Sequence, residues 1–189
     1  MSRPWQEHSA ETLLETRVFA VRSLRRTSPR DGNVHEFWVI DPPNWVNVVA
    51  LTEDGQIVLI DQWRHGSRSV VLEIPGGMRD PGEDALTAAK RELLEETGYA
   101  SDDWQWIGEV LPNPAIQSNR CATFLARNAK KVAETHFDTT EECVLRLEPA
   151  DSAADLVRTG VIDHALVLAA LNFAFLRGAL PFQPVAPAP

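Results

Sequence analysis

The densest set of residues able to do chemistry lies between Arg91 and Glu96. Glu92 and Glu96 are four positions apart, and Glu95 stands between them. The segment from Asp84 to Thr97 contains no proline or glycine and is rich in strong helix formers, so we expect one helix there. In a helix these three carboxylates lie along one arc. Such an arc suits a hard divalent cation, above all Mg²⁺, which prefers oxygen ligands and phosphate-bearing substrates.

A solvated acidic face is the alternative interpretation of the same residues. Such faces carry acid–base pairs four residues apart, and Arg91 with Glu95 forms one. Glu92 and Glu96 are instead like charges at this spacing, which costs an isolated helix about 0.2–0.5 kcal/mol unless a cation lies between them. The spacing by itself leaves both interpretations open.

The elements on either side would bring this helix to a sheet. Leu86, Ala89 and Leu93 form one apolar stripe along it, and Gly98 is placed to end it in the left-handed conformation. A short apolar strand, 70–74, runs into Pro75, Gly76 and Gly77 just before the helix. A glycine there lets the backbone approach a ligand closely, so the Gly76 carbonyl is a candidate metal ligand.

Strand patterns dominate the first half of the chain and helices flank the later strands, which indicates an α/β or α+β class. We expect a loose N-terminus over 1–15 and a hairpin over 16–44. A main domain would cover 45–178, and a proline-rich tail 179–189. Asp163 is the expected N-cap of the last helix, which would end at Arg177. The expected strands cover 16–24, 34–40, 45–52, 56–63, 70–74, 104–111, 120–126 and 143–147.

Composition excludes several classes of partner. The formal net charge of −9 over 189 residues argues against a nucleic acid or an anionic membrane, since both need a basic face. The apolar run Ala165 to Leu176 is shorter than the roughly 17 residues that span a bilayer, and the first residues lack a signal-peptide core. Cys121 and Cys143 have no metal-ligand spacing, which favours buried free thiols in a reducing compartment. We expect a cytoplasmic protein.

The stretch from Gly77 to Tyr99 resembles the Nudix box, Gly-x5-Glu-x7-Arg-Glu-aliphatic-x-Glu-Glu-x-Gly-aliphatic, at every fixed position; only the last residue, Tyr99, departs from the aliphatic class. The resemblance implies the Nudix α/β/α sandwich with a mixed sheet, and hydrolysis of a nucleoside diphosphate linked to another moiety. It also implies a metal site, which is expected to be formed by the Gly76 carbonyl, Glu92, Glu96 and Glu141.

Within this family the chain looks most like the ADP-ribose pyrophosphatase and nucleoside-diphosphate-sugar hydrolase branch. Pro114 follows the box at a position that marks the branch, and Gln62-Trp63-Arg64 resembles its Gln-aromatic-Arg strand end, whose arginine meets substrate phosphate. An ordinary surface cation is the alternative for Arg64. The leading hairpin resembles an extension that these homodimers exchange or pack across. The resemblance makes the following residues candidates for substrate binding: Arg64, Met78, Asn113, Pro114, Ala115, Phe19 and Trp38.

The general base is an open point. The resembling enzymes supply it from a loop with the pattern Asp-Glu-x-Glu, but here the sequence from Asp138 places Thr139 at the expected base, and threonine cannot deprotonate water at neutral pH. Glu142, Glu95 and activation of the water by the metal alone are the remaining alternatives. Arg91 is expected to orient Glu95. Glu73, a charge in an apolar strand, is expected either to face solvent or to support Arg91 or the metals.

These observations predict a Mg²⁺-dependent pyrophosphohydrolase, with Mn²⁺ as the alternative ion. It would cleave ADP-ribose or a related nucleoside-diphosphate sugar to a nucleoside monophosphate and a sugar phosphate. A Nudix hydrolase for another substrate, such as a dinucleoside polyphosphate, is one alternative. A non-catalytic domain that senses ADP-ribose is the other, and the intact carboxylate set argues against it.

Overall fold

The computed structural model describes residues 3–135 and 142–181. The chain forms two compact units. The first comprises Met1–Asn44 and Leu111–Arg120, and the second comprises Trp45–Val110 and Cys121–Pro189. Each is described by itself below.

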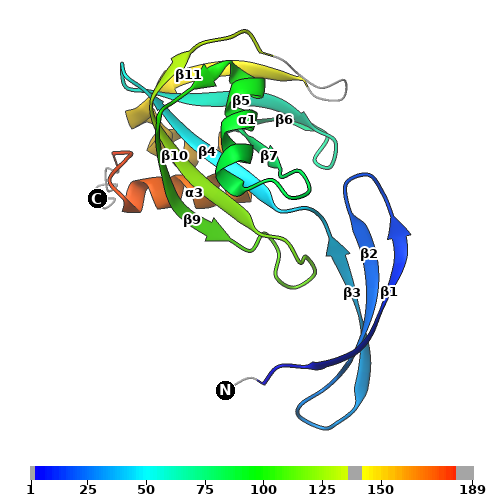
Figure 1. Cartoon of the computed structure of the whole chain (residues 1–189). Coiled ribbons are helices and arrows are strands. Elements are labelled where there is room, and N and C mark those ends of the chain that lie inside the picture. Colours follow the sequence, from blue (N-terminus) through cyan, green and yellow to red (C-terminus); the bar gives the residue numbers. More distant parts are fainter. Residues whose placement is uncertain (1–2, 136–141, 182–189) are drawn as a thin grey trace, which may run out of the picture. The chain divides into compact units, whose positions relative to one another are not determined.

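The first unit is built on a three-stranded antiparallel sheet, β1-β2-β3 (Figure 1), with β1 at Gln6–Glu15, β2 at Ala20–Thr27 and β3 at Val34–Asp41. The expectation of a loose N-terminus over 1–15 was therefore wrong. Every side chain of β1 is exposed, so its sequence carries little apolar alternation. The strand is held instead by its backbone ladder with β2, by a 2.8 Å ion pair between Arg26 and Glu7, and by the edge-to-face packing of Trp5 on Phe37.

The second unit contains a mixed sheet of eight strands. β4 and β10 run parallel in its centre, and the remaining pairs are antiparallel. The strands are β4 (Trp45–Thr52), β5 (Gln56–Arg64), β6 (Ser69–Glu73), β7 (Gly76–Met78), β8 (Tyr99–Ala100), β9 (Asp103–Val110), β10 (Cys121–Lys131) and β11 (Cys143–Pro149). The path is β11-β5-β4-β10-β8; β6 pairs with β5, β7 with β4 and β9 with β10.

Helices cover both faces of this sheet (Figure 1). The helices are α1 (Ala85–Thr97), α2 (Ala153–Arg158) and α3 (Ala165–Leu176). Successive residues of a strand point to opposite faces, and β4 shows this directly. Val48 packs in one core cluster with Leu93 of α1, while its neighbour Val49 packs in the other cluster with Leu171 of α3. This three-layer arrangement confirms the predicted α/β/α sandwich.

The caps of two helices differ in how well the sequence predicted them. Asp84 caps α1 by accepting the backbone N–H groups of Leu86 and Thr87, and Gly98 ends it at φ 72°. The predicted N-cap of α3 was wrong, because His164 takes that position in place of Asp163. The His164 side chain does not bond to the helix. It turns to the site described below.

Cys121 and Cys143 are buried thiols that form no disulfide, as expected. Burial raises the pKa of the Cys121 thiol to about 12. Within residues 3–135 and 142–181, no helix has the length and apolar character needed to cross a bilayer.

Candidate active site

The acidic edge of α1 is buried against β7. Glu92 and Glu96 are only 7% and 3% exposed, which excludes the solvated-face interpretation for these two residues. The Gly76 N–H donates to Glu96 Oε2 at 2.9 Å. A Cβ placed on Gly77 would stand 2.5 Å from Glu92 Oε1. The backbone of β7 therefore lies directly on the two carboxylates, at Gly76 through its N–H group and at Gly77 because this residue lacks a Cβ.

Arg91 donates hydrogen bonds to three neighbouring carboxylates. Its guanidinium donates to both oxygens of Glu83 at 3.1 Å, to Glu92 Oε1 at 2.9 Å and to Glu95 Oε2 at 3.2 Å. It also donates to the carbonyl oxygen of Met78 at 3.0 Å. The hydrogen bond to Glu83, above all, raises the pKa of Arg91. Arg91 thus fixes Glu95 as predicted, and it fixes Glu83 and Glu92 as well.

The donor set of this edge fits a hard cation. Glu92 and Glu96 supply buried carboxylate oxygens on one face of α1, next to the glycine backbone of β7. No group of three or more His, Cys, Asp or Glu side chains converges as a metal site in the described part of the chain. The fourth predicted ligand, Glu141, lies outside the described residues. Glu95 is more open, with 46% of its side chain exposed.

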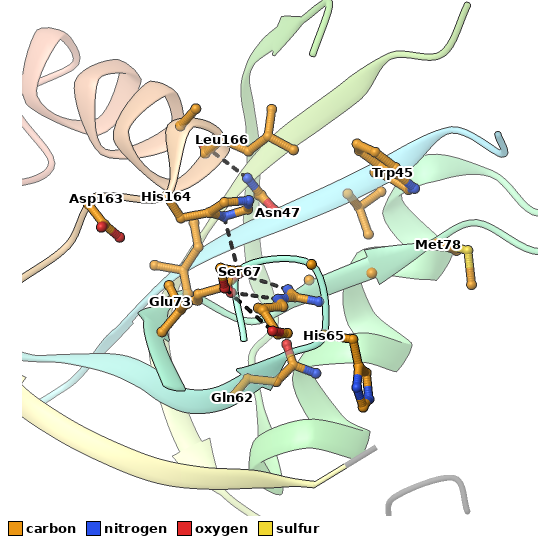
Figure 2. A pocket seen from close by; sticks show the side chains of 18 residues that line it. Trp45, Asn47, Gln62, His65, Ser67, Glu73, Met78, Asp163, His164 and Leu166 are labelled. Atoms are coloured by element: carbon orange, nitrogen blue, oxygen red, sulfur yellow. Dashed lines mark hydrogen bonds and ion pairs between the residues drawn. The ribbon is translucent and has the colours of Figure 1, made fainter. Parts of the chain in front are cut away.

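A cavity of about 640 Å³ opens beside these carboxylates. Its walls come from β4 to β7, from the turn after β5 and from the residues that begin α3 (Figure 2). Gly76 and Gly77 form part of its lining, so the buried carboxylates of α1 lie just behind that wall. Of the predicted substrate-binding residues, Arg64 and Met78 line it, and Trp45 adds an aromatic surface.

A charged cluster centred on one buried carboxylate lies in this cavity. Glu73, 2% exposed, accepts from Arg64 Nε at 2.6 Å and from Arg64 Nη2 at 2.8 Å. His164 Nδ1 lies 3.2 Å from Glu73 Oε2 (Figure 2), a close contact that lacks the alignment of a hydrogen bond. Burial by itself would raise the pKa of Glu73, but the hydrogen bonds from Arg64 above all, together with the close approach of His164, lower it to about 2. The same bond to Glu73 raises the pKa of Arg64.

This cluster corrects one expectation and adds one residue. Glu73 was expected to face solvent or to support Arg91 or the metals, but it is buried and its partners are Arg64 and His164. His164 was not predicted as a site residue from the sequence. One histidine before an apolar helix is no signal by itself, and its partner lies 91 positions earlier in the chain.

Gln62 is a second polar group in the cavity, and it was not predicted as a site residue from the sequence. It is 6% exposed, and its Oε1 atom is buried with no hydrogen-bond partner in the described structure. Figure 2 shows its amide pointing into the cavity. On the opposite wall, Asn47 Nδ2 donates to the Leu166 carbonyl at 3.1 Å and so anchors the first turn of α3.

The other predicted site residues stay predictions. Phe19, Trp38 and the segment 113–115 belong to the first unit, where Trp38 is exposed and Phe19 is half-buried. Glu142 is exposed and directly follows residues that the structure does not describe.

The chain is similar to known proteins both in sequence and in fold. A model of the NUDIX domain matches residues 42–171. The ADP-ribose pyrophosphatase of Bacillus subtilis (strain 168) is 28% identical over 154 residues, which cover 81% of this chain and 83% of the relative. The ADP-ribose pyrophosphatase of Mycobacterium tuberculosis (strain ATCC 25618 / H37Rv) is 29% identical over 164 residues, 85% of this chain and 78% of the relative. The crystal structure of ADP compounds hydrolase has the same fold, with a TM-score of 0.82, 23% identity and coverage of 95% and 97%.

Proposed function

The chain belongs to the NUDIX domain family, and we propose that it hydrolyses the diphosphate bond of ADP-ribose or a related nucleoside-diphosphate sugar. The products would be a nucleoside monophosphate and a sugar phosphate. The observation that carries this proposal is the cavity with two charged sides. The guanidinium of Arg64 is on one side, and the buried carboxylates Glu92 and Glu96 lie behind the Gly76–Gly77 wall.

Arg64 would bind a phosphate of the substrate. Its planar fork suits bidentate contact with an anion better than a lysine ammonium would. Glu73 already occupies Nε and one hydrogen of Nη2, so the outward N–H groups of the fork remain for a ligand. The names of the two relatives, both ADP-ribose pyrophosphatases, favour ADP-ribose as that ligand.

The site would hold Mg²⁺, with Mn²⁺ as the alternative. Glu92, Glu96 and the Gly76 carbonyl are the proposed ligands, and Glu141 is a further one from the sequence. Bound there, the ion would polarise the diphosphate and activate the attacking water. Arg91 holds Glu92 and Glu95 in place and offsets their mutual repulsion. Glu95 and Glu142 are the two candidates to take the proton of the water.

The protein would form a homodimer through its first unit. Its sheet has three strands, and Trp38 and Phe37 on β3 are exposed large side chains. Small exposed sheets gain stability by packing against a partner. We propose that residues 16–44 pair with a second copy, and that Phe19, Trp38 and 113–115 contribute to substrate binding. A monomer at micromolar concentration in sedimentation, still fully active, would contradict this.

Product identification tests the proposed reaction. The protein is incubated with ADP-ribose and Mg²⁺, and the products are separated and identified; AMP and ribose 5-phosphate are the expected pair. Dinucleoside polyphosphates and other sugar nucleotides form the comparison panel.

A Glu96→Gln variant keeps the side-chain shape but removes a ligand charge, so its turnover should fall at least about a hundredfold. If ADP-ribose binds but neither form hydrolyses it, the sensing alternative holds.

A further inference from the structure

Glu73 joins two groups that come from distant parts of the chain. Arg64 ends β5, and His164 stands directly before α3. Both meet the same buried carboxylate, Arg64 at 2.6 and 2.8 Å and His164 at 3.2 Å. A buried carboxylate needs such partners, because an unpaired charge at this depth is costly.

The pairing sets the direction of the arginine. Glu73 accepts from the Nε and Nη2 atoms of the guanidinium, which leaves Nη1 for a ligand in the cavity that Arg64 lines. Among the described residues, Arg64 donates from its side chain only to Glu73. Without this bond, a long side chain that is partly exposed would sample many rotamers, and binding would cost the entropy of ordering it.

His164 in turn restrains the carboxylate. Glu73 Oε2 contacts both Arg64 Nη2, at 2.8 Å, and His164 Nδ1, at 3.2 Å, so the imidazole limits the room in which the carboxylate can turn. The His164 side chain has no capping bond to α3 that would explain its position. We propose that His164 is a positioning residue, which acts through Glu73 to hold Arg64 ready for a substrate phosphate. This inference rests on the proposed function in assigning a phosphate to Arg64.

A purely structural role for His164 is the competing explanation, since the contact also ties α3 to the sheet. The bond from Asn47 to the Leu166 carbonyl ties down the same first turn independently. A variant at His164 should therefore keep its fold, and the two roles can be separated by experiment.

The experiment uses His164→Ala and His164→Asn in the full chain. Asparagine places its amide nitrogen close to the position of Nδ1 of the imidazole, so it keeps a polar N–H group beside Glu73. With ADP-ribose as substrate, His164→Ala should raise KM about tenfold and change kcat less than about threefold, because the contact to a phosphate is made before and during the reaction. His164→Asn should restore KM to within about threefold. In an Arg64→Ala background, His164→Ala should have no further effect.

A second measurement separates this inference from the proposed reaction. Binding of inorganic pyrophosphate is measured by calorimetry in the presence of EDTA, and His164→Ala should weaken it about tenfold. If the unaltered protein binds pyrophosphate but does not hydrolyse ADP-ribose, only the proposed function fails. Three results overturn the inference: no pyrophosphate binding, equal affinity in His164→Ala, or an equal effect of His164→Ala with and without Arg64.

The matched control is Glu148→Gln. Glu148 pairs with Arg146 Nε at 2.7 Å on β11, which is a similar contact away from the cavity. Losing this pair should leave both KM and pyrophosphate affinity unchanged. If His164→Ala loses stability but keeps its KM, the histidine has only a structural role, and this result also overturns the inference.

Discussion

Gly77 and Glu92 are packed so closely that no side chain fits between them. A Cβ on Gly77 would stand 2.5 Å from Glu92 Oε1, and Arg91 Nη1 donates to that same oxygen at 2.9 Å. Gly77 is not among the glycines with positive φ, so alanine is allowed there by the backbone. The fixed glycine that opens the box is thus explained by the carboxylate it faces.

Gly77→Ala should therefore fold but lose activity. The methyl group would push Glu92 from its place, and we expect turnover to fall at least about tenfold, with more Mg²⁺ needed for half-maximal rate. The measurement is a Mg²⁺ titration of the rate, with circular dichroism as the check on folding.

Gly108→Ala provides a clash of equal size elsewhere. Its Cβ would stand 2.5 Å from the ring of Phe173 in α3. Overpacking should lower the free energy of unfolding by about 1–3 kcal/mol without altering the Mg²⁺ dependence. If Gly77→Ala and Gly108→Ala had the same kinetic profile, the special role of the Gly77–Glu92 contact would be disproved.

The local part of the site could be predicted from the sequence, because a helix places residues four apart on one face. Glu92, Glu96 and the contact from Arg91 to Glu95 follow from that period. The partner of Glu73 depends on strand register. In the pairing of β5 with β6, Glu73 lies opposite Ile60. Arg64 follows Ile60 by four residues in β5, so its side chain is on the same face of the sheet as Glu73. Nothing within either strand fixes that register.

The contact from His164 depends on the whole fold, which brings the start of α3 over the sheet. β1 was missed for a different reason. Its side chains are all exposed, so its backbone pairing leaves no apolar pattern to read.

Glu73 should make the protein sensitive to acid. Its pKa falls from 4.5 to about 2 on folding, so its contribution to stability is full above pH 4.5 and is lost as the pH falls toward about 2. A shift of this size corresponds to about 3 kcal/mol. Urea unfolding between pH 6 and 2.5 should show this loss in the unaltered protein.

Glu73→Gln should be less stable at neutral pH and should lose less stability over the same range of pH, because glutamine does not titrate. Equal pH dependence in the two proteins would mean that another group causes the acid sensitivity.

Gln62 should show opposite effects on stability and binding. Its buried Oε1 has no partner in the described structure, which costs about 1–3 kcal/mol. Methionine has a similar size and no such atom, so Gln62→Met should raise the free energy of unfolding by about 1 kcal/mol. If a substrate hydroxyl donates to Gln62, the same change should raise KM for ADP-ribose about tenfold. Urea unfolding and steady-state kinetics check the two parts. If Gln62→Met is more stable and its KM for ADP-ribose is unchanged, the unpaired oxygen has no role in substrate recognition.

The identity of the proton acceptor leads to the last prediction, made with Glu142→Gln. Thr139 stands where the resembling enzymes have a base, and Glu142 is exposed directly before β11. If Glu142 accepts the proton, the variant should lose about 10²–10⁴-fold in rate and recover part of it at higher pH, where hydroxide is more abundant. If the ion alone activates the water, the rate should change less than about tenfold at any pH. Glu95→Gln is the matched comparison, because Glu95 is also partly exposed and is held by Arg91 at 3.2 Å. A pH–rate profile of both variants at saturating Mg²⁺ distinguishes the three cases, and a large loss in Glu95→Gln with none in Glu142→Gln would assign the base to α1.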